Sequence, residues 1–215
     1  MGCDNCDPSK YYPGRIIKTD KDLNTCSECG NKIDHRFLPI TSILVRWDSY
    51  FHSICETISS KSPCLSQKIG AILVYDHSII STGYNGPARG IPHCGYKRLI
   101  NDNIIRKLMP QSPDTIDYVE STCPRKVLGY ASGTHMELCP AQHAEENCIS
   151  NAARNGVSVL NSTLYINCII PCKNCFSTLI NAGINEIVVE EITPYDEFTQ
   201  FLINNSDIKI RRFEL

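Results

Sequence analysis

The chain has 215 residues, a formal net charge of -2 and 42% hydrophobic residues, which is enough for one sizeable core with a small appendage. A balance so close to neutrality provides no broad positive surface and argues against binding to long nucleic acids. The polar residues 1–10 do not resemble a signal peptide, and no apolar run reaches membrane-spanning length, so we expect a cytoplasmic protein.

Cysteine is the outstanding residue of the composition, with 13 copies. An odd number of cysteines in a chain without a secretion signal favours free thiols and metal sites over disulfides. Three pairs have the C-x-x-C spacing that lets two thiolates on one turn reach the same zinc ion. They are Cys3/Cys6, Cys26/Cys29 and Cys172/Cys175.

Residues 1–36 have no periodic apolar pattern and hold the first two of these pairs. Such a segment cannot bury enough apolar surface to fold alone, so we predict a zinc ribbon with Cys3, Cys6, Cys26 and Cys29 as ligands. A flexible tail with incidental thiols is the alternative. Acidic residues between the pairs favour a docking or subunit contact at least as much as nucleic-acid binding.

Residues 37–215 alternate between helical and strand patterns. The elements predicted in chain order are a helix from 47 to 62, strands at 69–75 and 78–82 joined by a turn at Asp76-His77, a short helix at 97–109, a helix at 141–155, a strand at 162–168, a helix at 172–182, a strand at 186–189, a helix at 195–203 and a strand at 208–212. A hairpin followed by three βα-type units predicts a three-layer α/β domain, in which helices cover both faces of one mixed five-stranded sheet.

Three details of this domain bear on function. Cys55 and Cys148 fall on helix faces turned to the core, and His77 reads as a solvated turn residue, so none of them is expected to bind metal. Residues 95–134 form an insertion that is longer than ordinary connections. A segment of this length either carries function or needs a link that holds it in place.

The strongest site prediction combines His143-Ala144-Glu145 with Cys172 and Cys175. Both motifs start helices, so they meet at the carboxyl-end edge of the sheet, where α/β folds place their sites. One imidazole and two thiolates supply three zinc ligands and leave a position open for water, as in catalytic zinc sites. Glu145 can take the proton of that water, which suits hydrolytic attack on an amidine-like carbon with loss of ammonia. The order H-x-E then P-C-x-x-C is the known signature of zinc-dependent nucleobase deaminases.

On these motifs the chain resembles the deoxycytidylate (dCMP) deaminases of the cytidine deaminase-like superfamily. The resemblance covers most of residues 46–192. The segments that carry it are 46–51, 63–71, 83–86, 92–94, 132–139, 143–145, 171–175 and 182–184.

The resemblance implies deamination of dCMP to dUMP, feeding thymidylate synthesis, in a homo-oligomer such as a hexamer. It also implies regulation by a deoxynucleoside triphosphate with Mg²⁺. It makes His143, Cys172 and Cys175 the zinc ligands and Glu145 the proton shuttle. It places Asn85, Gly86 and Ala144 at the substrate, and the regulatory nucleotide at Gly83, Tyr84, Asn85 and Gly86.

Some members of the family carry a second, structural zinc. Cys64, Cys94, His135 and Cys139 stand where the resemblance expects its ligands, with Cys123 as a fifth candidate that could replace Cys64. Four of the five would close a tetrahedral site and would order the insertion.

The chain departs from the family pattern in three places. The N-terminal cysteine pairs lie outside the common core. The strand that enters the site, residues 165–171, is one residue longer than usual. Val189 or Glu190 stands where a tyrosine often follows the fourth strand, which leaves Tyr195 as the nearest aromatic residue.

Two other functions remain open from the sequence. The same chemistry could act on dCTP, on a modified deoxycytidine nucleotide or on cytosine in a polynucleotide, although the lack of a basic face argues against the last. A non-catalytic nucleotide-sensing zinc protein is the second possibility, and Glu145 argues against it because a structural zinc needs no such carboxylate.

Overall fold

The structure is a computed structural model that describes residues 39–109, 114–131 and 133–215. The cysteines of the predicted N-terminal ribbon, Cys3, Cys6, Cys26 and Cys29, lie outside the described residues. The chain divides into two compact units, Met1–Tyr50 with Glu214–Leu215 and Phe51–Phe213, and the second contains the sheet and the site. No helix in the described ranges is both long enough and apolar enough to span a bilayer.

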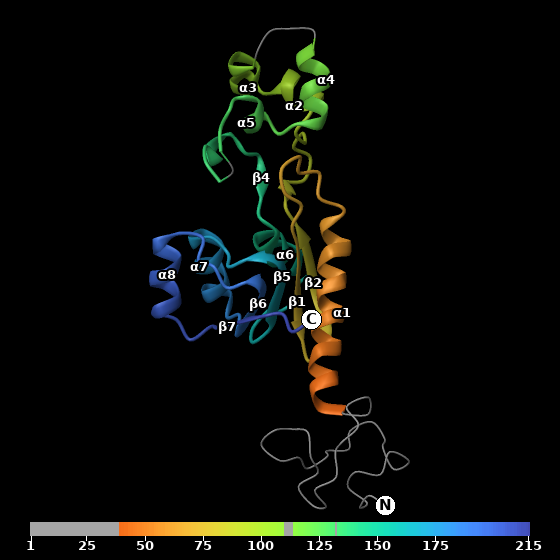
Figure 1. The fold of residues 1–215 in the computed structure, drawn as a ribbon, viewed down its shortest axis with the longest axis vertical. Helices are drawn as coiled ribbons and strands as arrows, with labels where there is room; N and C mark the ends of the chain where they lie inside the picture. Colours follow the sequence, from red (N-terminus) through yellow and green to blue (C-terminus); the bar gives the residue numbers. More distant parts are fainter. Residues whose placement is uncertain (1–38, 110–113, 132) are drawn as a thin grey trace, which may run out of the picture. The chain divides into compact units, whose positions relative to one another are not determined.

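Five strands form a mixed sheet in the order β2-β1-β5-β6-β7 (Figure 1). β1 pairs antiparallel with β2 and β5, whereas β5, β6 and β7 run parallel. The strands are β1 Gly70–Tyr75, β2 Ser78–Tyr84, β5 Thr163–Ile169, β6 Glu186–Glu191 and β7 Lys209–Arg212. The predicted mixed five-stranded sheet is confirmed, and each predicted strand overlaps an observed one.

The turn between β1 and β2 is the predicted one. Asp76 and His77 both have left-handed backbone angles, with φ of 47° and 59°. Two consecutive residues with positive φ give the twist that a two-residue hairpin loop requires. His77 is exposed, as expected for a solvated turn residue.

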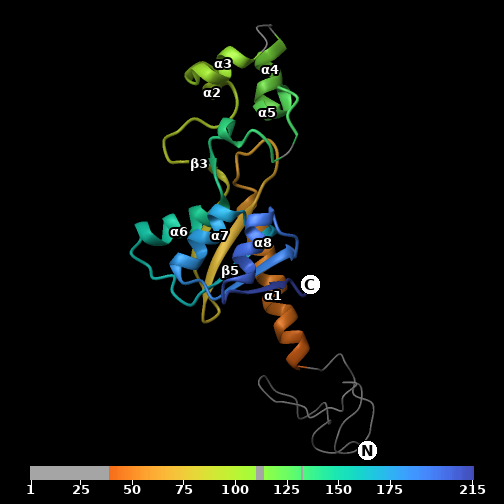
Figure 2. The same ribbon diagram turned by 90° about the vertical axis from the view of Figure 1, so that its left-hand side faces the viewer.

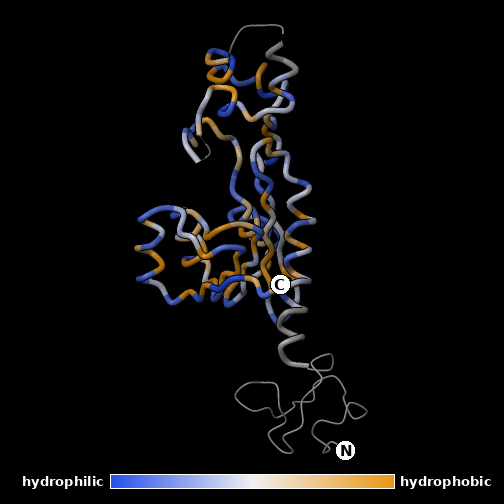
Figure 3. Tube along the Cα trace, viewed as in Figure 1, coloured by the Kyte–Doolittle hydropathy of each residue, from blue (hydrophilic) through white to orange (hydrophobic). Residues whose placement is uncertain are grey.

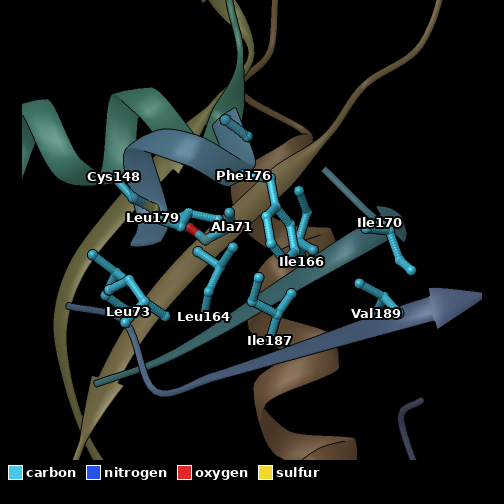
Figure 4. Close-up of a cluster of buried hydrophobic side chains, with 12 residues drawn as sticks. Ala71, Leu73, Cys148, Leu164, Ile166, Ile170, Phe176, Leu179, Ile187 and Val189 are labelled. Atoms are coloured by element: carbon cyan, nitrogen blue, oxygen red, sulfur yellow. Dashed lines mark hydrogen bonds between the residues drawn. The ribbon is translucent and has the colours of Figure 1, made fainter. Parts of the chain in front are cut away.

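Successive residues of the strands point to opposite faces of the sheet, and both faces are buried. On one face, Leu164 and Ile166 of β5 belong to a cluster of twelve buried residues that includes Phe176 and Leu179 (Figure 4). On the other face, the ring of Tyr165 lies 4.7 Å from that of Phe51, centroid to centroid. Figure 3 shows hydrophobic residues concentrated along the strands, as expected for a sheet buried on both faces.

Helices supply the two outer layers. The helices α6 Ala144–Arg154 and α7 Lys173–Ala182 pack on the Leu164 face, together with α8 Glu197–Asn204 (Figure 2). Residues 51–59 of α1 Pro39–Ser59 cover the opposite face, where the Cys55 thiol donates to the Tyr165 carbonyl oxygen at 3.4 Å. Cys55 and Cys148 are fully buried, which confirms their prediction as core residues.

Two helix starts differ from the prediction. α1 begins at Pro39 rather than near Trp47, because proline suits the first turn of a helix and the helical pattern extends back to it. Asp48 therefore lies within the helix, and its side chain accepts a hydrogen bond from the Glu214 amide at 3.0 Å. α6 begins at Ala144 rather than Ala141, because β4 Ala141–Gln142 pairs with β3 Gly86–Pro87.

The insertion, residues 95–134, contains more helix than the sequence predicted. The single helix expected at 97–109 is two helices, because the Asp102 carboxylate accepts from the amides of Ile104 and Ile105 at 3.0 and 3.1 Å and so caps a new helix. The segment after it, for which no element was predicted, contains two more helices. The helices are α2 Tyr96–Asn101, α3 Asn103–Leu108, α4 Asp114–Ser121 and α5 Pro124–Val127.

β5 carries an irregularity where it approaches the site. Ile166 pairs with Val189 and Ile169 pairs with Glu191, so β5 uses one more residue than β6 over this stretch. A bulge of this kind redirects the side chains that follow it. It agrees with the extra residue noted in the sequence and leaves Cys168 in the wall of the cavity described below.

Candidate metal centre and substrate cavity

His143, Cys172 and Cys175 come together at the starts of two helices. His143 is the N-cap residue of α6, and Cys172 is the N-cap residue of α7 with Cys175 in the first turn. His143 Nδ1 lies 3.5 Å from Cys172 Sγ and 3.3 Å from Cys175 Sγ. Among the described residues, these three form the one group whose ligand atoms all lie within 4.8 Å of one another.

Hydrogen bonds among the three side chains shift their pKa values. Hydrogen bonds from Cys175 and then from His143 lower the pKa of Cys172 to about 4. The bond with Cys172 raises the pKa of His143 to about 9. A thiolate and an imidazole in contact are the donors that zinc prefers, and three ligands leave its fourth position open. The residues present therefore match a catalytic zinc.

Glu145 lies in the first turn of α6, two residues after His143. Its side chain is 5% exposed, and it lines the same cavity as His143 and Cys172. Burial raises the pKa of this carboxyl, because the charged form loses its hydration. A carboxyl in this state can hold a proton and release it to a neighbouring group.

The cavity at this centre measures about 510 Å³. This volume lies in the range of sites for small molecules of nucleotide size. Its walls come from β5, the start of α6, the start of α7 and the insertion. Residues that line it include Cys64, Gln67, Asn85, Arg125, Thr134, Cys139, Ala144, Cys168 and Tyr195.

Asn85 and Ala144, both predicted at the substrate, line the cavity. The Asn85 side chain also holds the cavity wall together. Its Oδ1 accepts from Ser62 Oγ at 2.7 Å and from the Ile69 amide at 2.8 Å, and its Nδ2 donates to the Gln67 carbonyl at 2.8 Å. The second N–H of the Asn85 amide has no hydrogen-bond partner among the described residues.

The other residues predicted to bind the regulatory nucleotide, Gly83, Tyr84 and Gly86, do not line the large cavity. A Cβ at Gly83 would lie 2.4 Å from the Ala144 carbonyl oxygen, so this glycine lets β2 pass close to α6. The Tyr84 carbonyl accepts from Asn147 Nδ2 at 2.8 Å. Gly86 lines a second, smaller cavity. Of the four residues, Asn85 is the one that reaches the large cavity.

That second cavity measures about 20 Å³ and is lined by Cys64, Cys94, Cys123 and Cys139. It has room for about one water or one ion. All four are free thiols, and burial raises the pKa of Cys94. Arg98, a buried residue of α2, donates from Nη1 to Cys94 Sγ at 3.4 Å. The fold therefore brings four cysteines and a cation to one place.

His135, the other ligand candidate for the second zinc, does not line this cavity. Its backbone is left-handed, with φ of 50°, and its Nδ1 lies 2.9 Å from Glu137 Oε1. Its ring stacks on Tyr130 with centroids 3.7 Å apart. Cys123, the fifth candidate, lines the small cavity together with Cys64, Cys94 and Cys139.

Arg125 is a cavity residue that the sequence analysis did not single out. It lies on α5 and is 8% exposed, although in the sequence it reads as one more basic residue of the insertion. No local pattern marks it, because its place depends on the path of the whole insertion. Tyr195, noted as the nearest aromatic residue, also lines the cavity.

Comparison with known proteins identifies the family. Residues 45–191 match the family described as "Cytidine and deoxycytidylate deaminase zinc-binding region". The chain belongs to this deaminase family. The matched region contains His143, Glu145, Cys172 and Cys175, so the residues brought together by the fold lie within the deaminase family's zinc-binding region.

Individual proteins that are similar to this chain are named deoxycytidylate deaminases. The deoxycytidylate deaminase of Saccharomyces cerevisiae is 30% identical over 167 residues, which are 78% of this chain and 45% of the yeast protein. The deoxycytidylate deaminase of Enterobacteria phage T4 is 34% identical over 143 residues, 63% of this chain and 72% of the phage protein. The chain thus spans less than half the length of its yeast relative.

A solved deaminase has the same fold. The crystal structure of dCMP deaminase from the cyanophage S-TIM5, in complex with dCMP and dUMP, is similar with a TM-score of 0.53 at 20% identity. The similarity covers 78% of this chain and 96% of the cyanophage chain. It confirms the predicted deaminase fold.

Proposed function

We propose that this protein hydrolyses dCMP to dUMP and ammonia. The observation that carries the proposal is the meeting of His143, Cys172 and Cys175 at the edge of a cavity of about 510 Å³, which His143, Cys172 and the buried carboxyl of Glu145 line. The names of the relatives support the choice of dCMP as substrate. The volume is sufficient for a nucleotide and leaves room for a water molecule beside it.

His143, Cys172 and Cys175 would hold a zinc ion. Bound there, the ion supplies Lewis acidity, which in such sites lowers the pKa of water from about 16 to about 7. The helix starts that carry the three ligands are fixed by the sheet, so the ligands need little rearrangement.

Glu145 would move the protons of the reaction. Its carboxylate oxygen accepts a proton from water as the water oxygen bonds to C4 of the cytosine ring. Its raised pKa lets it keep that proton briefly and pass it to ring nitrogen N3, where it stays in the product; Glu145 then carries the second proton of the water, from the new hydroxyl on C4, to the departing amino group. The C4–N bond breaks, ammonia leaves, and the walls of the cavity hold the uracil product.

The test of this proposal is a Glu145→Gln variant of the zinc-loaded protein, assayed for dUMP and ammonia from dCMP. Gln keeps the size of the side chain but cannot take a proton, so we expect a fall in kcat of about 10²- to 10⁴-fold. Glu146→Gln is the matched control, because Glu146 is the next residue and is absent from the described wall of the cavity. Full activity of Glu145→Gln would falsify the mechanism.

A substrate panel separates this function from the alternatives. The wild-type protein is assayed side by side on dCMP, dCTP and single-stranded DNA. We expect the highest kcat/KM on dCMP. A preference for either of the other two would move the function to that substrate, and nucleotide binding without turnover would indicate a sensing protein.

We also propose a structural zinc held by Cys64, Cys94, Cys123 and Cys139. The support is the cavity that these four cysteines line, together with the buried Arg98, whose charge offsets part of the charge of four thiolates. Four protein ligands close a zinc site, which makes this one structural. Binding would draw the sulfur atoms together and join the insertion to the rest of the deaminase domain.

Elemental analysis of the purified chain tests the metal sites. Three zinc ions per chain would agree with the catalytic site, the four-cysteine site and the predicted N-terminal ribbon. Two zinc ions per chain would exclude either the four-cysteine site or the N-terminal ribbon. One zinc ion per chain would leave only the catalytic site.

Assembly and regulation are proposed on the resemblance alone. We expect a homo-oligomer whose activity responds to a deoxynucleoside triphosphate with Mg²⁺, in a cytoplasmic step that feeds thymidylate synthesis. Light scattering with and without dCTP and Mg²⁺ measures the subunit number, and a monomer would contradict this expectation.

A further inference from the structure

Arg125 is a buried cation whose hydrogen bonds are incomplete. Its Nη1 donates to the Thr134 carbonyl oxygen at 2.6 Å and to Met136 Sδ at 3.0 Å. Its Nε is buried and has no hydrogen-bond partner among the described residues. Nε and Nη2 form one edge of a guanidinium group, with two parallel N–H donors. This edge makes no hydrogen bond to the residues that the structure describes.

Arg98, also buried in the insertion, shows what a structural arginine looks like here. Its Nε donates to Asp102 Oδ2 at 3.1 Å, its Nη1 to Cys94 Sγ and its Nη2 to the Leu138 carbonyl oxygen. Each of the three nitrogens thus has a partner in the protein. The two arginines are about equally buried, 6% and 8% exposed, so burial alone does not explain the difference.

An unpaired buried donor costs stability, and such groups are rare in native proteins. Arg125 lines the large cavity that also contains Glu145 and Cys172. Apart from His143, it is the one basic side chain among the described residues of that wall. A nucleotide phosphate is an anion, so a cation in the cavity wall favours its binding.

We infer that the guanidinium group of Arg125 binds the 5′-phosphate of the nucleotide, and that this contact makes the cavity selective for nucleotides over nucleosides. Bidentate pairing with an oxyanion is the geometry for which the guanidinium group is suited. The identification of the anion as a nucleotide phosphate rests on the proposed function. The existence of an anion site at Arg125 does not.

Arg125 also lines the small cysteine cavity, so its charge could serve the thiolates there instead. The two roles predict different losses. Without Arg125, a phosphate site loses its preference for phosphorylated ligands, whereas a thiolate site loses zinc.

The experiment measures the binding of dUMP and of deoxyuridine to the zinc-loaded full chain by calorimetry, for the wild type, Arg125→Gln and Arg125→Lys. Arg106→Gln is the matched control, because Arg106 is an exposed arginine of the same insertion. We expect the wild type to prefer dUMP by about 10- to 100-fold, the range for hydrogen bonds to a charged group. Arg125→Gln should bring this preference below about threefold, and Arg125→Lys, which keeps the charge but not the paired donors, should give an intermediate value.

Turnover and zinc content complete the test. For Arg125→Gln, kcat/KM on dCMP should fall by about the same factor, while kcat/KM on deoxycytidine and the zinc count stay at the wild-type level. The inference is overturned if Arg125→Gln loses equally on dCMP and deoxycytidine, keeps the wild-type preference for dUMP, or loses zinc. It is also overturned if the wild type does not prefer dUMP to deoxyuridine. If the wild type binds dUMP through Arg125 but does not convert dCMP, the proposed function fails and the anion site remains.

Discussion

The sheet and the insertion belong to the same unit but are stabilised differently. The Leu164 face of the sheet has a cluster of twelve buried residues packed against α6 and α7. Among the described residues of the insertion, the buried cluster has three members, Ile105, Met109 and Val119. Because each buried large apolar side chain contributes roughly 1.5–3 kcal/mol, the sheet can hold its shape alone, whereas the insertion depends more on its polar contacts.

The two proposed zinc sites differ in the same way, because one lies at the sheet and the other at the insertion. The catalytic ligands begin helices that rest on the sheet, so their arrangement exists before metal binds. Of the four cysteines of the small cavity, Cys64 lies before β1 and Cys123 lies in the insertion. Cys94 and Cys139 lie on either side of the insertion. We therefore expect metal at the first site to control chemistry and metal at the second to control local order.

The largest expected effect is on activity, from removing a catalytic ligand. Cys172→Ala should lower kcat/KM on dCMP by at least about 10³-fold, about 4 kcal/mol, and remove one zinc per chain. Far-UV circular dichroism should stay the same, because the sheet does not depend on this ion. Cys168→Ala, a second thiol in the wall of the cavity, should keep the full zinc count, and a loss there would show that the ligand set is misassigned.

A smaller, local effect is expected at the second site. Cys123→Ala should remove one zinc and speed amide hydrogen exchange in the insertion by at least about tenfold, while exchange in the sheet strands is unchanged. Cys55→Ala is the control, because Cys55 is buried against the sheet and away from both cavities. Faster exchange in the strands as well would mean that the two regions do not differ in the way described above.

A third effect concerns the contact between β2 and α6. Gly83→Ala places a Cβ 2.4 Å from the Ala144 carbonyl oxygen and 2.5 Å from the Cys148 amide nitrogen. Backbone must move to make room, so the free energy of unfolding should fall by about 1–3 kcal/mol in denaturant titrations. Thr82→Ala, the exposed neighbouring residue of β2, should change it by less than about 0.5 kcal/mol. If the two variants were equally stable, the close packing of β2 on α6 would be in question.

The smallest effect is expected at His135. Asn tolerates the left-handed backbone of this position, so His135→Asn should leave the zinc count unchanged and shift Tm by less than about 2 °C. The measurement distinguishes the four-cysteine site from the ligand set that includes His135. Loss of one zinc from His135→Asn would show that His135, and not Cys123, is a ligand of the second zinc.

Local patterns in the sequence were enough for much of the fold. The strands and the helices α6, α7 and α8 were predicted because alternating or 3.6-residue periodicity depends on neighbouring residues. The insertion was predicted poorly. Its short helices have a small core, and the one at Asn103–Leu108 starts because Asp102 caps it.

The catalytic set was likewise predictable from the sequence, because His143 with Glu145 and Cys172 with Cys175 are each close in the chain and each begin a helix. The sequence by itself thus determined the family resemblance, the sheet and the candidate zinc ligands. Only the tertiary structure decided that Cys123 rather than His135 lines the small cavity, and that Arg125 lines the large one with an Nε that has no partner among the described residues. Those placements depend on how a long segment with few buried apolar residues returns to the sheet, and no spacing along the chain encodes that path.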